Sequence, residues 1–266
     1  MNRKKAFKDK VVWITGASSG IGAALVKEFS VLGANIIASS NDPEGLEAVR
    51  KECSRPDSVK CVPFDLSDTS AIGDLVKELV DSFGYIDYLL NIGGISQRSR
   101  IEEPPLWLDR KIFEINYFGT IALSKAVLPY MISRKSGHIL ATSSISGRFG
   151  FPLRSAYSAS KQALHGFFET LFLENKKNRI RTSVIIPGRV RTNISLHALD
   201  KDGKEYGKMD DGQANGISPE LAARTIINGI VRNKREILVG KTELLMLYIR
   251  RIWPWLFFRI ADKVKN

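Results

Sequence analysis

Seven short apolar segments, separated by stretches of helical length, constrain the fold of this chain more than any other feature. The segments predicted as strands are 11–14, 35–38, 59–64, 86–90, 138–143, 181–186 and 236–239. The stretches predicted as helices are 21–32, 43–53, 71–83, 109–134, 155–176 and 219–233. Continuous apolar strands joined by helices form parallel sheets that are covered on both faces. We therefore expect an α/β fold with one doubly wound, parallel seven-stranded sheet and helices on both faces.

The chain divides into one folded domain and a short extension. Its 266 residues contain no internal repeat or composition break that marks a second domain, so residues 1–240 are predicted to fold as one unit. Segment 189–217 is rich in glycine and charge and follows the sixth strand. Ligands of open α/β sheets bind at the carboxyl ends of the strands, so this segment is predicted to be a lid over a substrate. Residues 241–266 form an apolar and basic C-terminal extension.

A glycine-rich turn, Thr15-Gly16-Ala17-Ser18-Ser19-Gly20-Ile21-Gly22, follows the first predicted strand directly. Glycines permit a tight turn and let a pyrophosphate approach the backbone closely. The next helix directs its N-terminal amides and its partial positive charge at that anion. A turn of this kind between a strand and a helix is a fairly specific signal for a dinucleotide cofactor and a Rossmann-like fold.

The end of the second predicted strand indicates which dinucleotide is bound. An acidic residue at this position binds the ribose hydroxyls of NAD, but here the sequence is Ser39-Ser40-Asn41-Asp42. Since no carboxylate occupies the strand tip, a 2′-phosphate is not repelled there. We expect NADP(H) to be favoured over NAD(H), with Ser40 and Asn41 as hydrogen-bonding residues. Asp42 leaves the alternative open, because as a ribose ligand it favours NAD(H).

Tyr157 and Lys161 lie four residues apart on a predicted helix and therefore share one face. A phenol has a reference pKa of about 10, and a neighbouring ammonium lowers that value. Ser144 follows a predicted strand, which brings its hydroxyl near the start of the same helix. A proton-transfer group, a cation that tunes it and a neutral hydrogen-bond donor suit chemistry on a carbonyl or an alcohol.

The glycine-rich turn and the Tyr157/Lys161 pair belong to a longer series of short motifs along residues 9–240. They are the turn 15–22, Asp65-Leu66, Asn91-Ile92-Gly93-Gly94, Asn116, Ser144, Tyr157, Lys161 and the segment 187–192. In this order and spacing the chain resembles the classical short-chain dehydrogenase/reductase family. The run Gly93-Gly94-Ile95-Ser96-Gln97-Arg98-Ser99 is similar to the member-seven branch of the dehydrogenase/reductase proteins, which are membrane-associated carbonyl reductases acting on lipid-like or steroid-like ketones. One departure is visible: the usual Asn-Asn-Ala-Gly of the family is Asn91-Ile92-Gly93-Gly94 here.

The resemblance implies a role for each site residue. Tyr157 is the expected general acid/base, and Ser144 is expected to polarise the substrate oxygen. Lys161 is expected to tune Tyr157 and bind the nicotinamide ribose, while Asn116 holds a water in the proton relay. The expected cofactor-binding residues are Gly16, Ser18, Ser19, Gly20, Ile21, Ser40, Asn41, Asp65, Leu66, Asn91, Gly93, Tyr157, Lys161, Pro187, Val190 and Thr192.

The composition of the chain limits which metals and binding partners are expected. Three histidines and two cysteines leave no His/Cys metal cluster, so no metal is expected. The net charge of +12 favours anionic partners, but the sequence holds no nucleic-acid-binding motif. The basic N-terminus has no apolar run typical of a signal peptide, so we expect a cytoplasmic protein. The resemblance implies a homodimer or homotetramer that forms through the helices near 109–134 and 155–176.

The segment 244–260 leaves two interpretations open. It contains apolar runs too short to span a bilayer, with tryptophans and arginines between them. These residues suit peripheral contact with a membrane. The alternative is a C-terminal helix packed on the fold or on a partner subunit.

The sequence thus predicts an NADP(H)-dependent oxidoreductase whose catalytic domain spans residues 1–240. Its substrate pair is a hydrophobic, lipid- or steroid-like ketone and the secondary alcohol, interconverted by hydride transfer. The main alternative is a dinucleotide-binding regulatory protein without turnover, which the full set of Asn116, Ser144, Tyr157 and Lys161 argues against. A sugar-nucleotide epimerase fits less well, because such enzymes usually carry a larger substrate domain after the sheet.

Overall fold

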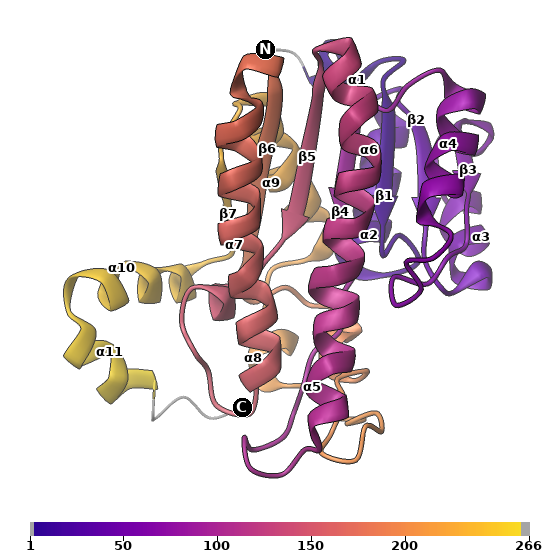
Figure 1. Cartoon of the computed structure of the whole chain (residues 1–266). Coiled ribbons are helices and arrows are strands. Elements are labelled where there is room, and N and C mark those ends of the chain that lie inside the picture. Colours follow the sequence, from indigo (N-terminus) through magenta and orange to yellow (C-terminus); the bar gives the residue numbers. More distant parts are fainter. Residues whose placement is uncertain (1–2, 262–266) are drawn as a thin grey trace.

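The computed structural model describes residues 3–261. Residues 262–266 of the predicted extension lie outside this range. The strands are β1 Val11–Thr15, β2 Asn35–Ser39, β3 Val59–Cys61, β4 Tyr88–Asn91, β5 Gly137–Thr142, β6 Ile180–Pro187 and β7 Glu236–Val239. They form one parallel sheet in the order β3-β2-β1-β4-β5-β6-β7 (Figure 1), which confirms the predicted doubly wound fold.

Helices cover both faces of this sheet. Their bounds are α1 Arg3–Phe7, α2 Gly20–Val31, α3 Pro43–Lys51, α4 Ile72–Phe83, α5 Leu106–Phe113, α6 Thr120–Arg134, α7 Ser155–Asn175, α8 Asp211–Ala214, α9 Pro219–Val231, α10 Leu245–Ile252 and α11 Pro254–Ala261. Alternate residues of β1 face opposite sides of the sheet. Val12 and Ile14 pack with α2, α3 and α9 on one side. Val11 and Trp13 pack with α4, α6 and α7 on the other side. The sheet therefore separates two hydrophobic cores, which is why its strands are apolar throughout.

Two predicted elements differ from the observed ones. The third strand ends at Cys61 rather than at residue 64, shortly before Pro63, which has no amide to donate to a sheet. The predicted helix 109–134 begins at Leu106 and contains a π-helical segment, Glu114–Gly119, between α5 and α6. Such segments are rare and frequently lie at functional sites, and this one carries Asn116.

Segment 189–217 is tied to the domain rather than extended away from it. Val190 pairs with Ile217 at its base, and Leu199 pairs with Gln97 from the loop after β4. It contains a short 3-10 turn, Asn193–Ser195, and α8. These contacts hold the segment at the carboxyl edge of the sheet.

The described part of the chain ends in α10 and α11, which project from the body beside the loop that follows β5 (Figure 1). Among the described residues, no helix is long and apolar enough to cross a membrane. Phe257 of α11 is buried against Phe149, with the ring centroids 4.7 Å apart. One face of this segment is therefore packed on the fold, as the second interpretation of 244–260 predicted.

Candidate active site

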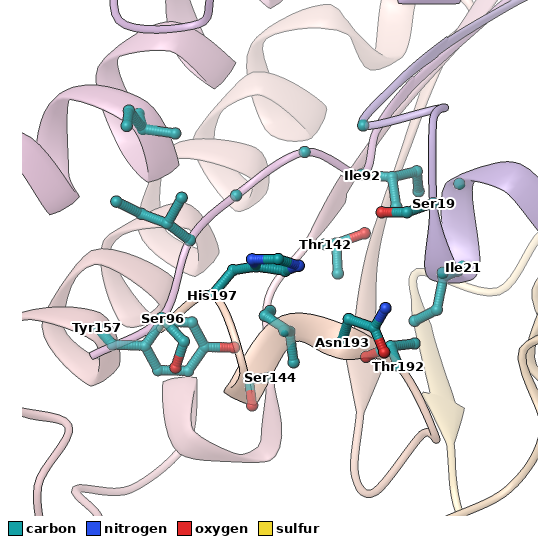
Figure 2. A pocket seen from close by; sticks show the side chains of 18 of the residues that line it. Ser19, Ile21, Ile92, Ser96, Thr142, Ser144, Tyr157, Thr192, Asn193 and His197 are labelled. Carbon is teal, nitrogen blue, oxygen red and sulfur yellow. The ribbon is translucent and has the colours of Figure 1, made fainter. Parts of the chain in front are cut away.

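A cavity of about 1020 Å³ opens at the carboxyl edge of the sheet. Its walls come from the turn after β1, from the ends of β2, β4, β5 and β6, from the start of α7 and from segment 189–217. Figure 2 shows Ser19 and Ile21 at one end of this cavity and Ser144 and Tyr157 at the other. The strand order reverses between β1 and β4 at this edge, which is where ligands bind in open α/β sheets.

The glycine-rich turn has room only for glycine at two points. Gly16 has φ +61°, and a Cβ there would lie 2.7 Å from the Cα of Gly93. A Cβ on Gly22 would lie 2.0 Å from the carbonyl oxygen of Gly16. The turn therefore brings the N-terminus of α2 to the cavity with no side chain in the way. The first amides of a helix have no partner within the helix, so this end suits a pyrophosphate.

Beyond this turn, polar groups from β2 and β3 surround the cavity. The hydroxyls of Ser18 and Ser40 lie 2.9 Å apart. The Oδ1 of Asp42 accepts a hydrogen bond from the Gly45 amide at 2.9 Å and thereby caps α3. Asp65 lines the same end, and its Oδ1 accepts from both the amide and the hydroxyl of Ser67 at 2.8 Å. The carboxylate of Asp42 is thus engaged in a helix cap, a role that a Pro-Glu-Gly sequence after it favours.

Tyr157 and Lys161 lie on the first turns of α7 and are both buried. Lys161 Nζ donates to the carbonyl oxygen of Thr142 at 2.9 Å and lies 6.0 Å from the centre of the Tyr157 ring. Burial lowers the pKa of Lys161 to about 8. Ser144 caps the turn after β5, where its Oγ accepts from the Ser146 amide at 3.1 Å. The structure therefore brings the hydroxyl, the phenol and the amine to one end of the cavity.

The electrostatics of Tyr157 reflect its burial and its charged and polar neighbours. Burial raises the pKa of Tyr157 above its ordinary value. A hydrogen bond with Ser144 and the charges of Arg154 and Arg98 act in the opposite direction, whereas Lys161 is not among the groups that shift this pKa. That Lys161 tunes Tyr157 stays a prediction. The nearby arginines are the cations that favour the phenolate.

Two predicted site residues lie behind the cavity wall. Asn116 accepts from the Ile95 amide at 2.8 Å through Oδ1, and its Nδ2 donates to the Ile95 carbonyl and to Ser160 Oγ. A Cβ on Gly94 would lie 2.7 Å from Asn116 Oδ1 and 2.9 Å from Lys161 Nζ, so a glycine is needed between them. Asn91 is buried, and its Nδ2 donates to Ser124 Oγ and to the Leu140 carbonyl. The remaining predicted site residues all line the cavity.

Sequence reasoning missed a buried ion cluster at the Tyr157 end. Asp210 accepts hydrogen bonds from the guanidinium groups of Arg98 and Arg154, at 2.9 Å for Arg154 NH2. Arg98 also donates to Ser96 Oγ at 2.8 Å. The cluster joins the loop after β4, the start of α7 and segment 189–217. Arg98 belongs to a polar run directly after two glycines at a strand end, which was the only local signal for it.

His197 is a second cavity residue to which the sequence analysis assigned no role. It lines the cavity from segment 189–217 and lies above Ser144 and Tyr157 in Figure 2. Its Nδ1 lies 2.8 Å from Glu205 Oε1, another residue of the cavity wall. His138 and His165 are buried and do not line the cavity.

Comparison with known proteins agrees with this geometry. A family model described as short chain dehydrogenase matches residues 10–202. The mouse (Mus musculus) protein named dehydrogenase/reductase SDR family member 7B is 40% identical over 265 residues, which cover 97% of this chain and 82% of that protein. A Drosophila melanogaster relative, named dehydrogenase/reductase SDR family protein 7-like, is 38% identical over 262 residues, or 96% of this chain and 80% of its own length.

A solved structure has the same fold. The short chain dehydrogenase/reductase of Burkholderia phymatum, crystallised in complex with NAD, superposes with a TM-score of 0.82 at 22% identity. The match covers 94% of this chain and 95% of that one. At this identity the likeness concerns the fold.

Proposed function

Because the chain belongs to the short-chain dehydrogenase family and is therefore an NAD(P)-dependent oxidoreductase, we propose that it interconverts a hydrophobic ketone and its secondary alcohol with NADP(H). The ketone is lipid- or steroid-like. The observation that carries this proposal is one cavity with the glycine-rich turn at one end and Ser144, Tyr157 and Lys161 at the other.

The chemistry follows from what these side chains offer. Bound NADP(H) supplies or accepts the hydride. Tyr157 is the general acid in reduction and the general base in oxidation, exchanging a proton with the substrate oxygen. Ser144 donates a hydrogen bond to the same oxygen. Lys161 has a pKa of about 8 and is mostly an ammonium at neutral pH, which suits a hydrogen bond to the nicotinamide ribose. Asn116, bonded to Ile95 and Ser160, holds a water of the proton relay.

The preference for NADP(H) is supported by the β2 end of the cavity. Ser18, Ser40 and Asn41 offer hydroxyl and amide groups there. The nearest carboxylate of that segment, Asp42, already accepts the Gly45 amide. A 2′-phosphate therefore finds hydrogen-bond donors there, and the Asp42 carboxylate is held by a helix terminus.

A hydrophobic substrate is supported by the apolar part of the wall. Ile95, Phe151 and Ile194 line the cavity and come from three different segments between the strands and helices. Segment 189–217 supplies Ile194, Leu199 and His197 to this wall, in keeping with a lid over the substrate. The proposal is that residues 1–240 form the catalytic domain and that segment 189–217 covers the substrate during turnover.

The proposed assembly is a homodimer or homotetramer, in the cytoplasm and peripherally at a membrane. Phe118 and Tyr130, in the π-helical segment and α6, are 46% and 40% exposed, and Leu173 of α7 is 71% exposed. Such apolar side chains on the outer helices suit burial against a partner subunit. Peripheral membrane contact is proposed for segment 244–260.

The test is NADPH oxidation against a panel of long-chain and steroid ketones. Tyr157→Phe removes the transferable proton but keeps the ring, so turnover should fall at least about a hundredfold, while NADPH binding measured by calorimetry is retained. Tyr85→Phe is the control, because Tyr85 lies just before β4, at the amino ends of the strands, whereas the cavity lies at their carboxyl ends. Near-normal turnover of Tyr157→Phe would show that the assignment is wrong. NADPH binding without oxidation of any ketone would favour the regulatory alternative.

A further inference from the structure

A small polar cluster lies where α7 meets β7, the last strand of the sheet. It contains His165 and Glu169 of α7 and Glu236 at the start of β7. One nitrogen or oxygen atom from each of these side chains lies within 4.8 Å of such an atom from the other two. None of the three residues lines the cavity. The cluster therefore lies outside the candidate active site and takes no part in the chemistry proposed above.

The hydrogen bonds of Ser143 determine which ring nitrogen of His165 carries the proton. Ser143 Oγ donates its one proton to the carbonyl oxygen of Lys161 at 2.8 Å. The same oxygen lies 2.8 Å from His165 Nε2, so Nε2 is the donor in that contact. Burial lowers the pKa of His165 to about 4, which keeps the ring neutral at pH 7. The other ring nitrogen, Nδ1, therefore carries a lone pair.

This lone pair is buried and has no partner in the described part of the chain. His165 is 6% exposed, and its Nδ1 makes no hydrogen bond there. A buried polar atom without a partner is rare in folded proteins and requires an explanation. Histidines that bind a metal almost always donate their other ring N–H to an oxygen, as Nε2 does here to Ser143. The arrangement of His165 is thus that of a metal ligand.

The two carboxylates give the cluster a negative charge that one arginine offsets only in part. Glu169 and Glu236 are exposed, so ions from solution reach them. Arg148, from the loop after β5, forms an ion pair with Glu236. Burial lowers the pKa of Arg148, and the charge of Glu169 opposes this effect. Two carboxylates and one guanidinium leave one negative charge, so the cluster attracts a further cation.

We propose that His165, Glu169 and Glu236 bind a zinc ion. Zinc takes imidazole nitrogens and carboxylate oxygens as ligands, and sites with three protein ligands hold a water in the fourth position. His165 and Glu169 lie four residues apart and so share one face of α7. Tetrahedral ligand atoms at zinc distances of about 2.0–2.2 Å lie about 3.4 Å from each other, a spacing that small rotations of the two exposed glutamates provide.

The histidine nitrogen decides between cations. Calcium and magnesium take oxygen ligands, whereas imidazole suits zinc. The small number of histidines and cysteines led to the expectation that no metal is bound, but carboxylates supply two of the three ligands here. Arg148 is the rival cation, because its guanidinium must release Glu236 when the metal binds. The bound ion joins α7 to β7 at the edge of the sheet.

The test is calorimetric titration of the full chain, freed of metal and without a histidine tag, with zinc chloride. One ion per chain is expected, and zinc should raise the melting temperature because it binds the folded chain. Glu169→Gln and Glu236→Gln keep the size of the side chain but remove its charge. Each should weaken zinc binding at least about tenfold, since loss of even an outer partner of a metal ligand has this effect. Glu174→Gln is the matched control, because Glu174 is exposed on the same helix but lies outside the cluster.

Two further variants test the rival cation and the buried ligand. Arg148→Gln removes the competing guanidinium and should tighten zinc binding. His165→Gln should weaken zinc binding at least as much as the glutamate variants. Since His165 is buried, its replacement also affects folding, and the exposed Glu169 and Glu236 decide the question independently of that effect.

Three outcomes would overturn the proposal. The first is the absence of saturable zinc binding to the unmodified protein. The second is equal zinc affinity of that protein, Glu169→Gln and Glu236→Gln. The third is loss of zinc binding in His197→Gln, which would assign the metal to the other histidine–glutamate pair, His197 and Glu205. Zinc binding is measured without NADPH or ketone, so a failure of the proposed function leaves this result intact.

Discussion

Replacing Asp210 by asparagine should destabilise the protein strongly, although the two side chains have nearly the same shape. Asp210 is the carboxylate that Arg98 and Arg154 share. The side chain of Arg98 is 2% exposed and that of Asp210 is 7% exposed. Removing the negative charge therefore leaves the Arg98 cation buried without its carboxylate partner, and breaking a buried pair in this way costs about 3–5 kcal/mol.

This loss is large compared with the total stability of a folded domain, which is about 5–15 kcal/mol. For a protein of this size each kcal/mol lowers the melting temperature by about 2–4 °C, so Asp210→Asn should lower it by about 6–20 °C. Glu78→Gln is the control, because Glu78 is 70% exposed and lies 3.9 Å from Lys60. An exposed pair of that kind contributes about 0–1 kcal/mol.

The pH dependence of the free energy of unfolding provides a second measurement of the same interaction. Burial opposes ionisation of Asp210, but the hydrogen bonds and charges of Arg98 and Arg154 outweigh it and hold the pKa of Asp210 below its ordinary value. A carboxyl whose pKa is lower in the folded chain stabilises that chain above its unfolded pKa of about 4 and loses this effect as the pH falls through the folded value. The difference between the unmodified protein and Asp210→Asn should therefore shrink in acid.

Chemical unfolding of the two variants and the unmodified protein measures these differences. The double substitution of Arg98→Met with Asp210→Leu should recover most of the loss, since replacing a whole buried pair by apolar side chains is often neutral. If Asp210→Asn costs less than about 1 kcal/mol, as Glu78→Gln should, the reasoning from burial is refuted.

Two further predictions concern the cofactor and a buried histidine. Ser40→Asp should reverse the cofactor preference by opposing the 2′-phosphate with a negative charge; calorimetry that finds the unmodified protein already favouring NADH would contradict this and assign the ribose to Asp42. Burial lowers the pKa of His138 to about 3, so between about pH 6.5 and 3 the unfolded chain binds a proton that the folded chain does not, and the free energy of unfolding should fall as the pH is lowered through that range. His138→Gln should flatten this fall in urea titrations at several pH values; equal slopes for this variant and the unmodified protein would be inconsistent with the stated cause.

Local patterns were sufficient to predict the architecture. Apolar strands alternate with helical stretches, and each pattern is a property of neighbouring residues, so the doubly wound parallel sheet was predicted and is confirmed. The glycine-rich turn and the Tyr157/Lys161 pair are also local, because a turn and a helical spacing of four bring their groups together without help from distant parts of the chain.

The details that depend on long-range packing were not predictable. The sequence left open whether the C-terminal segment 241–261 packs on the fold or is exposed. In the structure, one face of this segment packs on the fold and the other face is exposed. Helical periodicity alone could not decide this, because apolar residues occupy both faces of α10. The partner for the inner face is Phe149, about a hundred residues earlier in the chain.

The sequence by itself therefore determined the sheet, the glycine-rich turn and the shared helical face of Tyr157 and Lys161, since each is encoded in a short window. Only the tertiary structure decided what surrounds Tyr157. Arg98 and Asp210 are separated by 112 residues and meet because Leu199 pairs with Gln97 and draws segment 189–217 onto the loop after β4. Burial there makes the charges of Arg98 and Arg154 effective on the phenol. Arg154 lies three residues before Tyr157 in the sequence, but Arg98 and Asp210 reach this place only through the fold.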